Sequence, residues 1–197
     1  MFLKDDLAGL IDQLSLSADV KISDMPDIDL YIEQLTSLID VKLSGHKREK
    51  NGKILTKTMV NNYTKAGLLM PPVNKKYSRD HFILLILIYY LKNILSINDI
   101  GKLFSPILNN IASRDDDVIS LGEIYSTFLE LVKIEIDSFS LSLMNKADLI
   151  MEKTAGVAGE KRDIAGLFLM VLMLVAQSNA QKRLAEKIID TYFSAGD

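Results

Sequence analysis

The run that most restricts the fold is IAGLFLMVLMLVA, residues 164–176, because thirteen successive positions carry no charged side chain. A helix with almost no polar face must be covered on most sides by other apolar surface. A membrane-spanning helix needs about 20 such residues, so the run predicts a helix buried in protein. We therefore expect a soluble protein that does not contact a membrane.

Apolar residues also recur at helical spacing through most of the chain. From Pro26, which suits a first helical position, they return every three or four positions as far as Leu43. GVAG, residues 156–159, is typical of the turn of an αα-hairpin. The sequence predicts an all-α fold without convincing strands, with helices over about 26–43, 57–66, 79–95, 97–104, 120–153 and 160–193.

Side chains that cap helices support these boundaries. The Thr56 hydroxyl can cap the helix that Gly67 ends, and Ser78 can cap the next one. The pairs Ser96–Asp99 and Ser120–Glu123 match the capping-box pattern.

Prolines and charges predict the interruptions between helices. Pro71 and Pro72 exclude helix over 69–77, which we expect to be extended or turning. Pro106 and the run SRDDD, residues 113–117, indicate a junction between two parts of the chain. SGHKREKNGK, residues 44–53, is typical of a cationic loop.

Charge is segregated along the chain although the formal net charge is only −3. Residues 1–41 carry two basic and nine acidic side chains, whereas residues 42–79 carry ten basic side chains and Glu49 alone. Such segregation indicates a local face that binds anions. The alternative is a lysine-rich loop that is merely solvated, or a basic face that binds an acidic protein partner.

The order of parts over residues 54–104 resembles the winged helix-turn-helix head of the MerR family of transcription regulators. The matching residues are Asn62-Tyr63, Gly67-Leu68-Leu69, Pro71-Pro72, Tyr77-Ser78 and Ser96–Ile100. The complete chain resembles more closely the bacterial family known as domain of unknown function 1836, whose members share the Tyr-x-Lys-Ala-Gly-Leu-Leu core. Thr58 and Asn61 stand where MerR-like recognition helices use Arg, and Asn62 replaces the first Tyr of the pair.

The resemblance implies three segments: an acidic extension at 1–25, a winged helix-turn-helix domain at 26–105, and a helical dimerisation or effector region at 118–197. It implies a cytoplasmic transcription regulator that binds double-stranded DNA through a recognition helix near 56–66. Because a short recognition helix reads few base pairs, such heads work in pairs, and we expect a homodimer. The rival function is a helical adaptor whose basic face meets an acidic partner.

The residue chemistry favours the same use of this stretch. A helix N-terminus and cationic side chains bind phosphates, and short amides pair with adenine edges in the major groove. The wing cations would contact the flanking backbone. Tyr63 is also a candidate for the apolar side of the helix, with its hydroxyl on a phosphate. The candidate DNA-binding residues are Lys47, Arg48, Lys53, Thr56, Lys57, Thr58, Asn61, Asn62, Tyr63, Lys65, Lys75, Lys76 and Arg79.

Catalytic, metal and cofactor sites are not expected. The chain has no cysteine and two histidines, and Ser78 near Asp80 and His81 is explained more simply by helix capping than by nucleophilic catalysis. The acidic run 115–117 lacks the spaced ligands of a calcium loop. A small-molecule effector pocket is a weaker hypothesis than core packing for the methionines and phenylalanines of the C-terminal half, which are Met144, Met151, Met170, Met173, Phe139 and Phe168.

Overall fold

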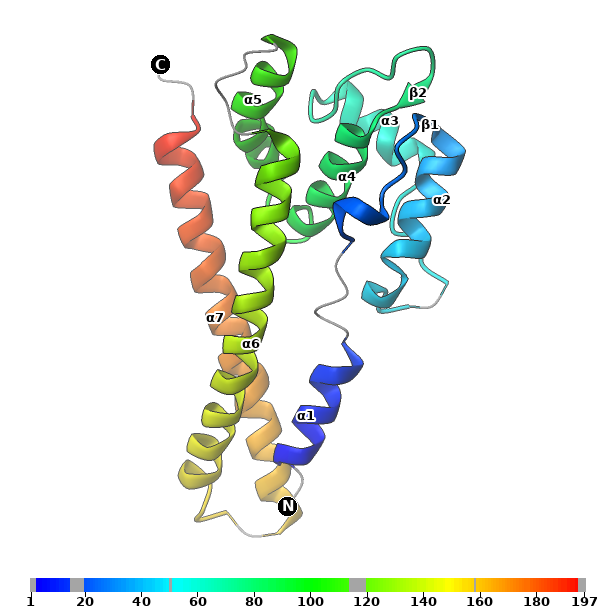
Figure 1. Ribbon diagram of the computed structural model, residues 1–197. Helices are drawn as coiled ribbons and strands as arrows, with labels where there is room; N and C mark the ends of the chain where they lie inside the picture. The colour runs from blue at the N-terminus through cyan, green and yellow to red at the C-terminus, as the bar shows by residue number, and fades with distance from the viewer. Residues whose placement is uncertain (1–2, 15–19, 50, 114–119, 158, 195–197) are drawn as a thin grey trace. The chain divides into compact units, whose positions relative to one another are not determined.

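The computed structural model describes residues 3–14, 20–49, 51–113, 120–157 and 159–194. These residues are mostly helical, which confirms the all-α class (Figure 1). The α-helices are α1 (Leu3–Gln13), α2 (Ile32–Lys42), α3 (Lys57–Lys65), α4 (Arg79–Leu91), α5 (Ile97–Ser113), α6 (Leu121–Lys153) and α7 (Glu160–Tyr192). Short 3-10 turns occupy Ile22–Asp24 and Ser44–His46.

Two compact units divide the chain. The head unit contains residues 19–129 and 184–197, and the hairpin unit contains residues 1–18 and 130–183. This division differs from the three segments expected from the sequence, because Val20 and Met25 belong to the core of the head unit and Leu7 to that of the hairpin unit.

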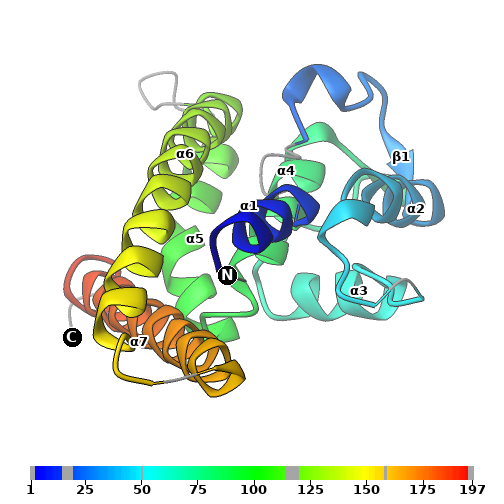
Figure 2. The same cartoon turned by 90° about the horizontal axis from the view of Figure 1, so that it is seen from below.

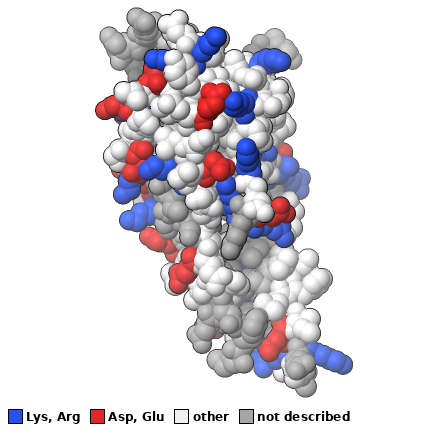
Figure 3. Space-filling model, turned by 90° about the vertical axis from the view of Figure 1, so that its right-hand side faces the viewer, with Lys and Arg blue, Asp and Glu red and all other residues white. Residues whose placement is uncertain are grey.

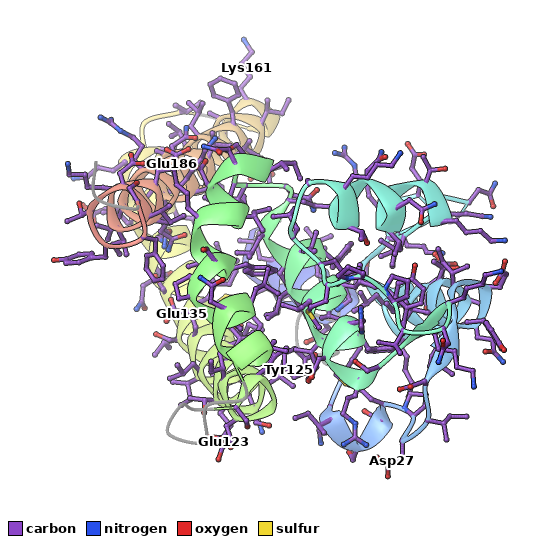
Figure 4. All side chains as sticks on the ribbon, turned by 90° about the horizontal axis from the view of Figure 1, so that it is seen from above. Asp27, Glu123, Tyr125, Glu135, Lys161 and Glu186 are labelled. Carbon is purple, nitrogen blue, oxygen red and sulfur yellow. The ribbon has the colours of Figure 1, made fainter. Side chains whose placement is uncertain are left out.

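The head unit is built around α4, in which residues 81–86 and Ile88 are all buried. Figures 1 and 2 both show α2, α3 and β1 gathered on one side of α4. Within this unit the fully buried Tyr125, labelled in Figure 4, donates its hydroxyl to the Val20 carbonyl at 2.7 Å. A buried phenol needs such an acceptor, so this bond ties the segment before α2 to α6.

Two short strands, absent from the expected fold, pair in the head unit. β1 (Leu30–Tyr31) and β2 (Lys76–Tyr77) are antiparallel, with Leu30 opposite Tyr77 and Tyr31 opposite Lys76. Because residues 30–31 are extended, α2 begins at Ile32 and not at Pro26. The Gln34 side chain accepts a hydrogen bond from the Tyr31 N–H at 2.9 Å and so caps this later start.

Two further helix ends differ from the expected ones. α4 ends at Leu91 and not near Leu95, because the N–H groups of Ile94 and Leu95 both donate to the Leu91 carbonyl and tighten the chain into a turn. α5 continues through the exposed Pro106 to Ser113. A proline inside a helix removes one backbone hydrogen bond, but the apolar side of α5 packs against the core on both sides of Pro106 and offsets that loss.

Of the two expected capping boxes, Ser120–Glu123 is confirmed, because the Glu123 carboxylate also accepts from the Ser120 N–H at 2.9 Å. At Ser96 the side chain caps the helix, but the Asp99 carboxylate accepts from the Ser96 hydroxyl, at 2.6 Å, and the reciprocal backbone bond is not formed. The Ser96 hydroxyl accepts from the Asp99 N–H at 3.1 Å, and the Ser120 hydroxyl accepts from the Glu123 N–H at 3.2 Å. Hydrogen bonds from Ser120 lower the pKa of the Glu123 carboxyl below its ordinary value. The junction residues 114–117 lie outside the described residues.

The hairpin unit consists of α1 and the parts of α6 and α7 on either side of the Gly156–Gly159 turn, which confirms the predicted αα-hairpin. Lys146 Nζ donates to Gln177 Oε1 at 2.5 Å, and the Arg162 guanidinium donates to the Met151 carbonyl at 2.7 Å. These bonds join α6 to α7 along an antiparallel contact (Figure 1). By length and composition, the part of α7 from Lys161 to Tyr192 is also apolar enough to cross a membrane.

Candidate nucleic-acid interface

α3 has the boundaries that the sequence predicts. Thr56 Oγ1 accepts from the Met59 N–H at 3.2 Å and caps the first turn. Gly67 has a φ of +72°, and the next N–H, that of Leu68, returns to the Tyr63 carbonyl at 2.9 Å. This left-handed end is the Gly-dependent helix stop. The hydroxyl of Thr56 is therefore occupied inside the helix cap.

One side of α3 is polar and exposed, and the other faces the core. Val60 is fully buried and Tyr63 is 7% exposed. The exposed positions follow helical spacing, and they are Lys57, Thr58, Asn61, Asn62 and Lys65. Two cations thus flank one hydroxyl and two amides on a single face of a short helix.

Tyr63 belongs to the packed side of this helix. It lies in the core of the head unit, and burial raises the pKa of its phenol. Of the two roles considered for Tyr63, the structure supports core packing. Its ring holds α3 against the unit, and the exposed face of α3 is made by other residues.

A tight β-hairpin follows α3. Val73 and Lys76 exchange two backbone hydrogen bonds, of 3.1 and 2.9 Å. The residues between them, Asn74 and Lys75, have φ values of 51° and 64°, as the central residues of a type I′ turn require. The expected turn over 69–77 is confirmed, and both Lys75 and Lys76 are exposed on the hairpin.

Tyr31 is a candidate that the sequence alone did not suggest. The β1–β2 pairing sets Tyr31 opposite Lys76, and the Lys76 ammonium lies 5.6 Å from the centre of the Tyr31 ring. Half of Tyr31 is exposed. The ring restricts where the cation can lie, because an ammonium is attracted to an aromatic face. A lone tyrosine before a helix carries no local signal for this contact.

Four of the ten cations of residues 42–79 form ion pairs with acidic side chains of residues 24–40. Lys47 binds Asp40 at 2.8 Å, Lys57 binds Glu33 at 2.5 Å, and Lys42 lies 3.8 Å from Asp24. Arg79 pairs with Asp27, and its Nε has no partner among the described residues. The acids at 24–40 are therefore counter-charges for the basic segment as well as part of an acidic N-terminal region.

The remaining cations form no ion pair with another described residue. They are Arg48, Lys53, Lys65, Lys75 and Lys76, all exposed, whereas Lys50 lies outside the described residues. Figure 3 shows blue and red groups interspersed over the face on the α2 side. The available positive charge is thus smaller than the ten basic residues of 42–79 suggest.

The loop before α3 is held at both ends by charged side chains. Asp40 accepts from the Ile54 N–H at 3.0 Å as well as from Lys47, and the Lys47 hydrogen bond is the main reason that its pKa lies below the ordinary value. Lys92 Nζ donates to the Ile54 carbonyl at 3.1 Å and lies over the Tyr89 ring. Burial lowers the pKa of Lys92. These contacts position the residues that lead into α3.

His81 connects the first turn of α4 to the segment that leads to the hairpin. Its Nδ1 accepts from the Ser78 N–H at 3.0 Å and lies 2.9 Å from the Ser78 hydroxyl, and its Nε2 lies 3.2 Å from the Met70 carbonyl. Accepting at Nδ1 leaves the proton on Nε2, which then donates to Met70. The His81 side chain thus caps the first turn of α4, with Ser78 as the N-cap residue.

The hairpin unit contains an open groove of about 370 Å³ between α6 and α7. Phe139 and Leu174 line it together with Glu135, Gln177 and Gln181. Of the residues considered for an effector pocket, Met144, Met151, Met170 and Met173 pack in the core of this unit, and Phe168 is exposed. No group of three or more potential metal ligands occurs among the described residues; the acids 115–117 lie outside them.

A known protein family matches most of the head unit. Residues 20–128 match the family model described as "Domain of unknown function (DUF1836)". The match covers more than half of the chain, so this protein is a member of that family. It spans almost all of the N-terminal part of the head unit, including α2, α3, the hairpin and α4. No curated protein and no solved structure matches the chain significantly.

Proposed function

We propose that this protein is a transcription regulator that binds duplex DNA as a homodimer, with α3 as recognition helix and the β2 hairpin as a wing. The observation that carries the proposal is the exposed side of α3, where Thr58, Asn61 and Asn62 lie between Lys57 and Lys65. Amides and hydroxyls can read base edges, while the flanking ammonium groups bind phosphates.

The order of elements in the head unit supports the proposal. A helix, a capped second helix, a two-residue hairpin and a buried third helix follow one another, as in the MerR-like head that the sequence resembles. The hairpin presents Lys75 and Lys76 beyond the C-terminal end of α3 in the sequence, and Tyr31 restrains Lys76. A wing with these cations would contact phosphates beside the groove that α3 enters.

The ion pairs refine the set of expected DNA contacts. Lys47 and Arg79 pair with Asp40 and Asp27, and Thr56 caps α3. We assign these three residues to positioning the interface. Direct contacts are assigned to the exposed residues, which are Arg48, Lys53, Lys57, Thr58, Asn61, Asn62, Lys65, Lys75 and Lys76.

A salt titration against duplex DNA tests the proposal. Displaced counterions make log K fall linearly with log salt concentration, by about 0.9 for each neutralised phosphate. The double variant Lys65→Glu/Lys76→Glu should abolish binding and leave the helical circular dichroism spectrum unchanged, because both residues are exposed. The matched control Lys133→Glu/Lys153→Glu reverses two charges on α6 and should bind normally.

If the protein is instead an adaptor, the same titration should show weak binding to DNA. A basic face specific for an acidic protein would bind DNA weakly, without preference between fragments selected from genomic DNA. Equal DNA affinity of the wild type and the Lys65→Glu/Lys76→Glu variant would exclude α3 and the wing as the DNA-binding surface.

A further inference from the structure

One side of the apolar run in α7 is uncovered within the hairpin unit. Met170 is 2% exposed and faces the core, whereas Ile164, Phe168, Val171 and Val175 are 68%, 63%, 57% and 52% exposed. Their spacing of four, three and four residues places them in one line along the helix. With the neighbouring Leu172, 49% exposed, we call these five residues the α7 stripe.

The other helix of the hairpin makes a lipid bilayer an unsuitable occupant of this stripe. The bonds Lys146–Gln177 and Arg162–Met151 set α6 beside the apolar run of α7. On that part of α6, Asp148 is exposed, as is Glu152. A bilayer that surrounded α7 would also have to receive these carboxylates, which is strongly unfavourable. The stripe therefore fits a protein surface.

The stripe is complementary to itself when two copies run in opposite directions. Its spacing of four, three and four reads the same from either end, so an antiparallel pair sets Ile164 against Val175 and Phe168 against Val171 of the other copy. Each contact then joins a larger side chain to a smaller one, as close packing requires. A parallel pair would instead place Phe168 against Phe168 and Lys161 against Lys161.

The charges at the ends of the run favour the same orientation. Lys161 is exposed and projects from the start of α7 (Figure 4), and Ser178 occupies the position at the far end that would face it in an antiparallel pair. Like charges brought together in a parallel pair would repel each other, and the parallel helix dipoles would add to the repulsion.

The size of the stripe is adequate for a specific contact. The five side chains expose on the order of 500 Å² of apolar surface, near the upper end of what monomers leave in one patch. A two-fold contact over them would bury about 1,000 Å² in total, at the lower limit for a specific interface.

We propose that the α7 stripe is a self-association surface on which a second copy of this chain packs its own α7 in antiparallel orientation. A closed two-fold contact uses the same patch on both copies, as the symmetric spacing of the stripe allows. The inference deepens the proposed function by locating the homodimer that it uses. Its test contains no DNA, so either proposal can fail without the other.

Sedimentation of the full chain without DNA tests the surface. The wild type should sediment at twice the chain mass of 22.0 kDa. Phe168→Glu should raise the dimer dissociation constant by at least about 30-fold, as expected for a charge placed at the centre of an interface. Leu141→Glu changes an α6 residue that is 67% exposed and lies outside the stripe, and it should leave the dimer intact.

Orientation is tested by the double variant Phe168→Glu/Val171→Lys. In an antiparallel pair the two new charges of opposite sign face each other and should restore association relative to Phe168→Glu. A parallel pair brings like charges together, so failure of rescue would overturn the antiparallel arrangement. Phe168→Ala, with smaller loss of association, serves if the charged variants fail to fold.

Two results would overturn the surface itself. One is a wild-type chain that remains at 22.0 kDa at its highest soluble concentration. The other is partition of the wild type into vesicles of phosphatidylcholine and phosphatidylglycerol that Phe168→Glu abolishes, which would assign the stripe to a lipid surface.

Discussion

The ion pair between Lys57 and Glu33 is the individual contact with the clearest consequence for DNA affinity. The two side chains are 55% and 61% exposed, and the Lys57 hydrogen bond lowers the pKa of Glu33. Exposed pairs contribute little to stability. The main effect of Glu33 is therefore to neutralise Lys57, so that this cation of α3 is less available to a phosphate.

Glu33→Gln should strengthen DNA binding because it releases Lys57. We expect affinity to rise by roughly 3- to 10-fold at low salt, the effect of one added charged contact, with little change in the free energy of unfolding. Fluorescence anisotropy with a labelled duplex measures the affinity, and urea unfolding measures the free energy of unfolding. Glu152→Gln on α6 changes the net charge equally and should have no effect on affinity; an equal rise there would show a general charge effect.

His81 predicts a pH dependence of stability. Burial lowers the pKa of His81 in the folded protein below its ordinary value of about 6.5. The unfolded chain then binds a proton before the folded one does, so the free energy of unfolding should begin to fall as the pH drops below about 6.5. A protonated ring would also lose the acceptor at Nδ1 for the Ser78 N–H.

His81→Asn tests this assignment. The variant lacks the donor for the Met70 carbonyl and should lose about 1–3 kcal/mol of stability at pH 7.5. Its stability should also change less than that of the wild type between pH 7.5 and pH 5.5, as measured by urea unfolding at each pH. The same pH dependence in both proteins would assign the titration to another group.

Among the secondary-structure elements, the hairpin before α4 is where a substitution should change DNA affinity without lowering stability. Lys75 adopts a φ of +64°, which costs a residue with a Cβ roughly 1–2 kcal/mol. Lys75→Gly should therefore leave the free energy of unfolding unchanged or slightly raised. DNA affinity should fall, and the magnitude of the salt slope should decrease by about 0.9.

Asn74→Gly is the matched control for the hairpin. It places glycine at the neighbouring residue, whose φ is +51°, without removing a charge. Affinity should be unchanged, and an equal loss in both variants would mean that flexibility of the hairpin, and not the Lys75 charge, causes the effect.

Thr56, the N-cap residue of α3, and Thr58, in its first turn, allow stability and DNA affinity to be changed separately. Thr56→Ala removes the side-chain acceptor of the Met59 N–H and should cost about 1 kcal/mol of stability. Thr58→Ala alters an exposed residue and should lower DNA affinity with stability unchanged. Thermal unfolding and anisotropy on the same preparations distinguish the two; a stability loss at Thr58 would place its hydroxyl in the fold.

For the complete chain, the number of unpaired cations limits the salt dependence of DNA binding. Five described cations of 42–79 form no ion pair with another described residue. Each head should then give a log–log slope of about −4 to −5, and a dimer that engages two half-sites about twice that value. Phe168→Glu should reduce the slope to that of one head.

Many local features of this protein are predictable from neighbouring residues. Thr56 and Gly67 delimit α3, Ser96 and Ser120 begin their helices as expected, and the Gly156–Gly159 turn joins the two longest helices. Each depends on hydrogen bonds or backbone angles within a few residues, so the necessary information lies in a short stretch of sequence.

The structure differs from the sequence-based predictions where residues far apart in the chain come into contact. Tyr31 becomes a candidate contact only because β1 pairs with β2, and this pairing also delays the start of α2. The pairs Lys57–Glu33 and Arg79–Asp27 join segments 24 and 52 residues apart. The segregation of charge along the sequence is the same whether or not these acids pair with the cations. It therefore predicts an anion-binding face in either case.

The all-α class, the boundaries of α3, the Ser96 and Ser120 helix starts and the surplus of cations at 42–79 were thus set by the sequence alone, because propensity, capping and composition act over one or two helical turns. The tertiary structure decided which cations remain available, which side of α3 is exposed and which side of α7 is uncovered. These properties depend on burial and on pairing between segments far apart in the chain, which no local pattern specifies.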